Sequence, residues 1–199
     1  MSLAREFQTI DILLGSDAET RGVDAFALSL IKAERQARRL LTYLVYQHPW
    51  CDRSTVPALK SALESSGKVY FEGLLAGWNA FYPRSVEQLI GSHYERLRGR
   101  LREAAKHRNK IFHGQLTVQG LKRHELLAFV DDIREWCSAL ARAAEAEVAY
   151  AGCANSFRKA SDPRALYSKY RTQLGGIAAY RQFIKDHMER AGGPTKHCN

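Results

Sequence analysis

The sequence predicts an all-α protein: a helical bundle of four to five main helices followed by a C-terminal helical extension. Apolar residues recur at helical spacing through most of the chain, and no segment shows the sustained alternation that is typical of β-strands. With 199 residues, 45% of them hydrophobic and 26% charged, the chain has a globular composition, which excludes disordered and fibrous classes. We expect the bundle over residues 1–152, and the extension with a flexible tail over residues 153–199.

A long first helix is expected to begin with Asp24 as its cap and to end at His48-Pro49. Apolar residues follow helical spacing along it: Phe26, Ala27, Leu30, Ile31, Ala37, Leu40, Leu41, Leu44 and Val45. A second helix should begin near Pro57, because proline is favoured in a first turn, and should break at residues 65–67. Between Val69 and Pro83, aromatic residues mix with glycines, and we expect a short irregular helix there.

Residues 85–88, Ser-Val-Glu-Gln, have the form of a capping box, in which the serine and glutamine side chains satisfy the first backbone amides of a helix. The helix that follows should end at Gly114, because glycine is favoured just past a helix C-terminus. One apolar stripe runs along it: Ile90, Tyr94, Leu97, Leu101, Ala104, Ala105, Ile111 and Phe112.

Three further helices are expected. A long amphipathic one runs over residues 126–148 and closes near Gly152. A short one opens at Asp162-Pro163, and a last one covers residues 177–190. The residues from Ala191 onward are expected to form a frayed tail.

The net charge of +9 is concentrated in one part of the chain. Residues 94–123 hold nine basic side chains against Glu95 and Glu103, so this segment carries +7, whereas residues 1–93 sum to 0 and residues 124–199 to +2. Such a local excess indicates a polyanionic partner. The alternative is a solvated basic helix face.

Arg108 falls in the middle of the apolar stripe and not on the charged side of the predicted helix. Because burying an unpartnered guanidinium is costly, such an arginine should face a counter-charge, a polar cleft or an anionic ligand. The structural alternative is an ion pair with an acid of a neighbouring helix, for which Asp131, Asp132 and Glu135 are candidates.

His113 follows Arg108 by five residues and stands directly before Gly114, so it is expected on the last turn. An uninterrupted helix would place the two side chains roughly 140° apart. One compact site therefore requires a loosened turn at Gly114 or two copies of the segment that meet across a dimer. For His113 alone, the alternative is a cation that complements the helix C-terminus.

The run Arg108-Asn109-Lys110-Ile111-Phe112-His113 resembles the R-x4–6-H motif of the HEPN superfamily, including the asparagine that follows the arginine in many of its ribonucleases. The resemblance covers nearly the whole span from Asp24 to Val148, with a long helix on each side of the motif. One position departs from a subgroup. Members paired with nucleotidyltransferase antitoxins carry tyrosine two residues after the histidine, where this chain has Gln115, and this does not favour neutralisation by modification.

The resemblance implies metal-independent cleavage of RNA that leaves a cyclic phosphate, with no cofactor. It also implies a homodimer, or a heterodimer of related domains, whose two motifs line one cleft. We therefore expect an endoribonuclease that acts as a toxin or as an abortive-infection effector in phage defence, together with an antitoxin or a regulatory partner protein.

The expected catalytic residues are Arg108, Asn109 and His113. RNA supplies its own nucleophile, the 2′-hydroxyl, so cleavage needs only a base, an acid and stabilisation of charge on phosphorus. His113 suits proton transfer because the unperturbed pKa of histidine, about 6.5, lies near neutral pH. Arg108 offers the phosphate a planar fork of donors, and Asn109 would orient the phosphate or the His113 ring.

Other basic residues of the segment are expected to gather and track the RNA backbone. They are Arg96, Arg98, Arg100, Arg102, Lys106, His107 and Lys110. Tyr94 and His107 are candidates to stack on bases, although the place of Tyr94 on the apolar stripe favours the core. His107 is also the second candidate for the catalytic histidine.

Four cysteines lie far apart in the sequence: Cys51, Cys137, Cys153 and Cys198. Their spacing favours reduced thiols over a zinc ribbon or a disulfide framework. The pairs His48/Cys51 and His197/Cys198 lack further ligands, so no metal is expected. Since no apolar run has the length of a membrane span and no signal-peptide pattern begins the chain, we expect a soluble cytoplasmic protein.

Two other classes of function remain open. A non-catalytic module of the same fold would bind nucleic acid, nucleotide or protein through the basic segment. A helical assembly or adaptor protein would instead pack its apolar stripe against a partner helix.

Overall fold

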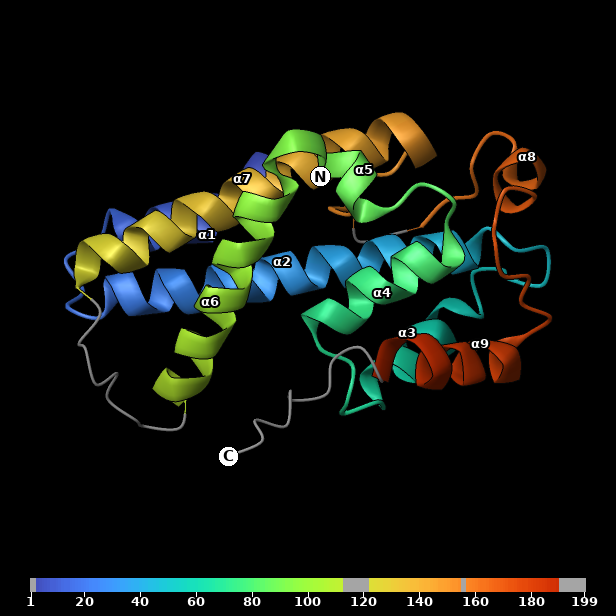
Figure 1. The fold of residues 1–199 in the computed structure, drawn as a ribbon, viewed down its shortest axis with the longest axis horizontal. Coiled ribbons are helices and arrows are strands. Elements are labelled where there is room, and N and C mark those ends of the chain that lie inside the picture. The colour runs from blue at the N-terminus through green and yellow to red at the C-terminus, as the bar shows by residue number, and fades with distance from the viewer. Residues whose placement is uncertain (1–2, 113–121, 155–156, 190–199) are drawn as a thin grey trace.

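The computed structural model describes residues 3–112, 122–154 and 157–189, and every regular element in these ranges is helical, which confirms the all-α class (Figure 1). In chain order the elements are α1 (Leu3–Leu14), α2 (Arg21–Tyr46), α3 (Val56–Glu64), α4 (Phe71–Phe81), α5 (Val86–Ile90), the 3-10 turn η1 (Gly91–His93), α6 (Tyr94–Phe112), α7 (Arg123–Val148), α8 (Pro163–Tyr167), α9 (Ile177–Phe183) and the π-helical turn η2 (Ile184–Glu189). Within these ranges, none of the helices has the length and apolar character needed to cross a membrane.

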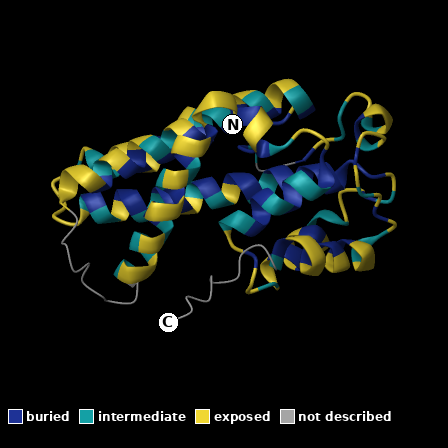
Figure 2. Ribbon diagram, in the orientation of Figure 1, coloured by how far each residue is buried: buried dark blue, intermediate teal, exposed yellow. Residues whose placement is uncertain are grey.

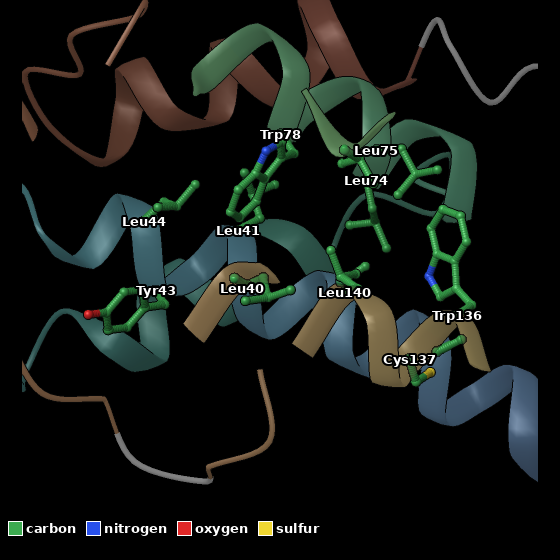
Figure 3. Packing of buried hydrophobic residues seen from close by; sticks show 14 of the residues in the cluster. Leu40, Leu41, Tyr43, Leu44, Leu74, Leu75, Trp78, Trp136, Cys137 and Leu140 are labelled. Atoms are coloured by element: carbon green, nitrogen blue, oxygen red, sulfur yellow. The ribbon is translucent and has the colours of Figure 1, made fainter. Parts of the chain in front are cut away.

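The central element is α2, which α7 accompanies on one side and α4 covers on another, while α6 crosses it (Figure 1). Side chains from three of these helices meet in the core, as Figure 3 shows for Leu40 and Leu41 of α2, Trp78 of α4, and Trp136 and Leu140 of α7. Figure 2 shows buried and exposed residues on the same helix for most elements, and in α6 and α7 the buried residues are those of the apolar stripe.

The second half of α2 is enclosed on all sides. Every residue over 40–46 is buried, because α3, α4, α7 and the C-terminal segment all pack around it. Polar groups there find partners in distant segments. The Tyr43 hydroxyl donates to the Val148 carbonyl oxygen, and the Tyr170 hydroxyl donates to that of Leu44, each at 3.0 Å.

The C-terminal extension packs into the same core as the bundle. Tyr180 is fully buried, and Met188 of η2 lies against α4, where Gly73 and Gly77 leave room for it. A Cβ on Gly73 would collide with the backbone carbonyl of Met188. The close contact between α4 and η2 therefore depends on glycine at this position. The expected frayed tail from Ala191 onward lies outside the described residues.

Two of the predicted helix starts are confirmed by hydrogen bonds from backbone amides to a capping side chain. Ser85 Oγ accepts from the Gln88 amide at 3.1 Å and Gln88 Oε1 accepts from the Ser85 amide at 2.9 Å, which confirms the capping box. Asp162 Oδ1 likewise accepts from the Ala165 amide at 2.9 Å. At the first long helix the predicted start is wrong: α2 begins at Arg21, and Asp24 lies in its first turn.

Two further corrections concern helices. The first helix is expected to begin at Asp24, yet α1 precedes it and buries Phe7 and Ile10, which are three residues apart on one face. The helix that opens at Ser85 is not continuous through the motif. It is interrupted at Gly91, whose φ of 72° lies in the left-handed region that glycine adopts without strain. The motif helix α6 therefore begins afresh at Tyr94.

Candidate functional site

The α6 helix carries the motif across α2. Its side toward the core is formed by Leu97, Leu101 and Ala104, which are at most 2% exposed. Arg108 continues this line, as its place on the stripe predicts, and its side chain is only 23% exposed. The position is thus half-buried at the point where α6 leaves the core.

A cavity of about 350 Å³ opens beside Arg108, between α2, the start of α4 and α6. Its apolar lining comes from all three helices: Leu30, Ala33, Phe71, Leu101 and Ala105. Its polar lining consists of Glu34, Tyr70, Glu72, Arg102, Arg108 and Asn109. A mostly apolar pocket with a few convergent polar groups is the usual form of a ligand site.

The Arg108 guanidinium is oriented by its neighbour in sequence. Asn109 Oδ1 accepts from Arg108 Nη2 at 3.1 Å and from Nε at 3.3 Å. The closest carboxylate oxygen in the described residues is Glu34 Oε2, 3.7 Å from Nη1, which is too long for a hydrogen bond. Arg108 is therefore held by Asn109 and has Glu34 as a counter-charge to which it makes no hydrogen bond.

Two of the three α7 acids considered for Arg108, Asp132 and Glu135, pair with other arginines. Asp132 of α7 lies 2.8 Å from Arg96 and 2.7 Å from Arg100, and Glu135 lies 2.6 Å from Arg96. The acid nearest Arg108 comes from α2 instead. The structural alternative, an acid from a neighbouring helix, therefore holds in general form, but the acid is Glu34 of α2 and none of the three α7 candidates.

Glu72 of α4 forms ion pairs with two more arginines of α6. Its Oε2 accepts from Arg98 Nη2 and its Oε1 from Arg102 Nε, both at 2.8 Å. Burial opposes the charged form of Glu72, but the hydrogen bonds and charges of Arg98 and Arg102 outweigh it and lower the pKa of this carboxyl. This carboxylate therefore stays ionised under physiological conditions.

Part of the local charge of residues 94–123 is thus offset within the fold. Arg96, Arg98, Arg100 and Arg102 all have carboxylates within 2.8 Å. Among the expected RNA-contacting residues, Lys106 and Lys110 are exposed and belong to no ion pair within the described part of the chain. Pairing does not bar an arginine from a phosphate, but it reduces the field that reaches solvent.

The two aromatic candidates near the motif lie on the side of α6 that faces α7. The His107 ring packs 5.6 Å from that of Phe129, its Nε2 lies 3.8 Å from Glu103, and its Nδ1 is buried with no hydrogen bond to the described residues. Tyr94 is 4% exposed and packs against Trp136. Neither side chain lines the cavity, so the structure does not bring His107 together with Arg108.

His113 lies outside the described residues, as do Gly114 and Gln115, so the structure places only Arg108 and Asn109 of the three catalytic candidates. It adds three cavity residues that the sequence analysis did not single out: Glu34, Tyr70 and Glu72. In the sequence, Glu34 stands four residues before Arg38, a spacing of charges that is common on exposed helix faces. The sequence therefore contains no local signal that marks Glu34 as a cavity residue.

Within the described residues, no three side chains of the metal-ligating types cluster together. Cys51, Cys137 and Cys153 are buried free thiols, and Cys198 lies outside the described residues. Burial raises the pKa of the Cys51 thiol to about 11, which keeps it in the unreactive protonated form.

In comparisons with protein-family models, with curated proteins and with solved structures, no match to this chain was found.

Proposed function

We propose that the chain is a metal-independent endoribonuclease of the HEPN type, with Arg108, Asn109 and His113 as its catalytic residues. The observation that carries the proposal is the state of Arg108. Alone among the five arginines of α6, it lines a cavity without a carboxylate within hydrogen-bonding distance. An anion at this place gains a charge-assisted contact with the guanidinium and breaks no hydrogen bond between Arg108 and a carboxylate.

The reaction needs no group beyond the RNA and these side chains. The 2′-hydroxyl attacks the adjacent phosphorus, the bond to the 5′ oxygen breaks, and a 2′,3′-cyclic phosphate and a 5′-hydroxyl remain. His113 moves the protons: it takes one from the 2′-hydroxyl and, as the imidazolium so formed, gives one to the leaving 5′ oxygen. Arg108 donates to the non-bridging oxygens, on which negative charge grows in the transition state.

Asn109 has a more specific role in this proposal than the sequence motif indicates. Its amide oxygen already accepts from two nitrogens of Arg108, so it acts as a positioning residue for the guanidinium. The exposed Lys106 and Lys110 supply the contacts that follow the RNA backbone. In the cell we propose a toxin or defence effector that works as a homodimer, restrained by an antitoxin or a regulatory partner.

The test is RNA cleavage by the purified protein in the presence of a chelator. We expect wild-type cleavage with cyclic-phosphate products, a loss of about 100-fold or more in Arg108→Ala, and a comparable loss in His113→Ala. Arg142→Ala is the matched control, because Arg142 is an exposed arginine of α7 that neither lines the cavity nor belongs to the residues expected to contact RNA, and its rate should stay within a few-fold of wild type. Wild-type rates in His113→Ala would overturn the proposal.

A second candidate is a non-catalytic nucleotide-binding or RNA-binding module. The internal pairing of four α6 arginines favours it, because that pairing weakens the basic surface expected of a nuclease. Retained binding without cleavage, over structured and single-stranded substrates, would select this candidate.

A further inference from the structure

We propose that the cavity beside Arg108 is a nucleobase pocket, in which Tyr70 stacks on one base of a single-stranded RNA and Glu34 reads its edge. The inference rests on the proposed function for the position of the phosphate at Arg108. It adds a subsite and two recognition residues, Tyr70 and Glu34, that lie outside the motif.

The size and lining of the cavity suit a flat aromatic ring. Its volume of about 350 Å³ lies in the range of small-ligand pockets. Leu30 and Ala33 of α2 and Leu101 and Ala105 of α6 form its aliphatic walls. These side chains offer contact area but no hydrogen bonds, so they favour the face of a base over a phosphate or a sugar.

Tyr70 supplies an aromatic surface at the same cavity. It stands directly before the first residue of α4, and it is 50% exposed, although large hydrophobic side chains of this protein are mostly buried. Other tyrosines, such as Tyr43, Tyr82 and Tyr180, are at most 3% exposed. An exposed aromatic ring at the wall of an apolar cavity is the arrangement used to stack single-stranded bases.

The polar edge of the pocket contains one unused acceptor. Glu34 Oε1 accepts from Arg38 at 2.8 Å, whereas Glu34 Oε2 accepts no hydrogen bond from the described residues and lies 3.7 Å from Arg108 Nη1. Both oxygens of Glu72, by contrast, are occupied. Glu34 Oε2 can therefore accept from the exocyclic amino group of adenine, cytosine or guanine, which uracil lacks.

The pocket and the phosphate site are close enough to serve one nucleotide unit. Arg108 belongs to the lining of the cavity and also points a guanidinium nitrogen toward Glu34. A phosphate bound at Arg108 thus lies beside a base held between Tyr70 and the aliphatic walls. The same residues fit a free nucleoside monophosphate and a nucleotide within a strand, so the test compares the two.

The experiment measures binding of the four nucleoside 3′-monophosphates and of short single-stranded oligoribonucleotides by calorimetry, together with KM and kcat for cleavage. We expect Tyr70→Ala to weaken binding by about tenfold and to raise KM with little change in kcat, while Tyr70→Phe retains the wild-type values. Ala105→Leu, which fills the cavity from α6, should weaken binding as well. Ile12→Ala is the matched control, because Ile12 is an exposed hydrophobic residue of α1 outside the cavity.

Base preference provides an independent readout. The wild type should bind the three amino-bearing nucleotides more tightly than the uridine nucleotide, and Glu34→Gln should reduce this ratio, which is insensitive to a uniform loss of affinity. Tighter binding of the oligoribonucleotide than of each monophosphate identifies RNA as the ligand. Binding of monophosphates alone overturns the assignment to RNA.

The outcomes separate this inference from the proposed function. Nucleotide binding that depends on Tyr70, in a protein that cleaves no RNA, supports the pocket and rejects the nuclease. Cleavage that depends on Arg108 but is unaffected by Tyr70→Ala and Ala105→Leu rejects the pocket alone. If Ala105→Leu changes the oligomeric state in multi-angle light scattering and leaves nucleotide binding intact, the cavity is a contact between chains and the inference is wrong.

Discussion

Arg108 and Glu34 face each other across the cavity, yet their closest nitrogen and oxygen atoms remain 3.7 Å apart. Arg102, on the same helix and in the same cavity lining, lies 2.8 Å from Glu72. The cavity therefore contains one arginine that is hydrogen-bonded to its carboxylate and one that is paired with its carboxylate at a longer distance, without a hydrogen bond. Arg108 is therefore the arginine of the cavity that we expect to bind an anion, a distinction that the number of basic residues in the segment does not predict.

Asn109 should affect catalysis through Arg108. In Asn109→Ala the guanidinium loses its two hydrogen bonds, and we expect kcat for RNA cleavage to fall by roughly tenfold, less than in Arg108→Ala. Asn109→Asp should behave differently, because a carboxylate would hold the guanidinium and compete with phosphate, so KM should rise. Steady-state kinetics separate the two effects. Equal changes in KM and kcat for both variants would contradict the positioning role.

Glu72 should be important for stability. Replacing it with glutamine leaves Arg98 and Arg102 without their carboxylate, and we expect the free energy of unfolding to fall by about 1–2 kcal/mol in urea titrations. Glu103→Gln is the control. Glu103 is half-exposed, and Arg100, which donates to it, also donates to Asp132 and so keeps a carboxylate in the variant. The free energy of unfolding should change by no more than about 0.5 kcal/mol.

The same carboxyl makes stability depend on pH. Its pKa is lowered in the folded state, so its stabilisation is present above the ordinary carboxyl pKa and is lost as the pH falls through the lowered value. The decline of unfolding free energy in acid should therefore be shallower in Glu72→Gln than in the wild type. An unchanged slope would contradict this contribution.

Alanine substitution should lower the stability of the protein at one glycine and raise it at another. Gly73→Ala places a Cβ against the backbone of Met188, and we expect a loss of at least about 1–3 kcal/mol, because a backbone atom cannot turn aside. Gly99 lies in α6 with open space around it, so Gly99→Ala should stabilise the protein by roughly 0.5–1 kcal/mol through helix propensity. Thermal unfolding of the two variants tests both signs. A neutral Gly73→Ala would show that η2 moves without cost.

His48 should destabilise the folded state in acid. Its ring is buried among aromatic side chains, and burial, with a further contribution from Lys159, lowers its pKa from 6.5 to about 4. Below pH 6.5 the unfolded chain takes up a proton that the folded chain does not, so stability falls as the pH falls. The loss reaches about 3 kcal/mol near pH 4.

Unfolding titrations at pH 7 and pH 4.5 test this contribution. His48→Phe removes the titrating group and keeps an aromatic ring, so its stability should change less between the two pH values than that of the wild type. His124→Gln is the control, because His124 is exposed on α7 and should leave the difference unchanged. A wild-type difference in His48→Phe would assign the acid sensitivity to other groups.

The helices predicted with most success are those with a local chemical signal. The capping residues Ser85 and Asp162 act over three residues of sequence, and both caps are present in the structure. The break at Gly91 was not predicted, because the apolar stripe continues on both sides of it while the backbone turns. The α1 helix was overlooked, although Phe7 and Ile10 carry a helical spacing that would have indicated it.

The sequence by itself determined that the chain is helical, that Arg108 lies on the inward side of its helix, and that basic residues gather in one segment, since all three follow from order and spacing along one helix. Only the tertiary structure decided which of those charges are offset. Glu72 and Asp132 reach the α6 arginines from α4 and α7, and Glu34 and Tyr70 bring the cavity to Arg108 from α2 and the start of α4. Coulomb energy and cavity shape depend on distances in space, and these pairs are 26 or more residues apart in the chain.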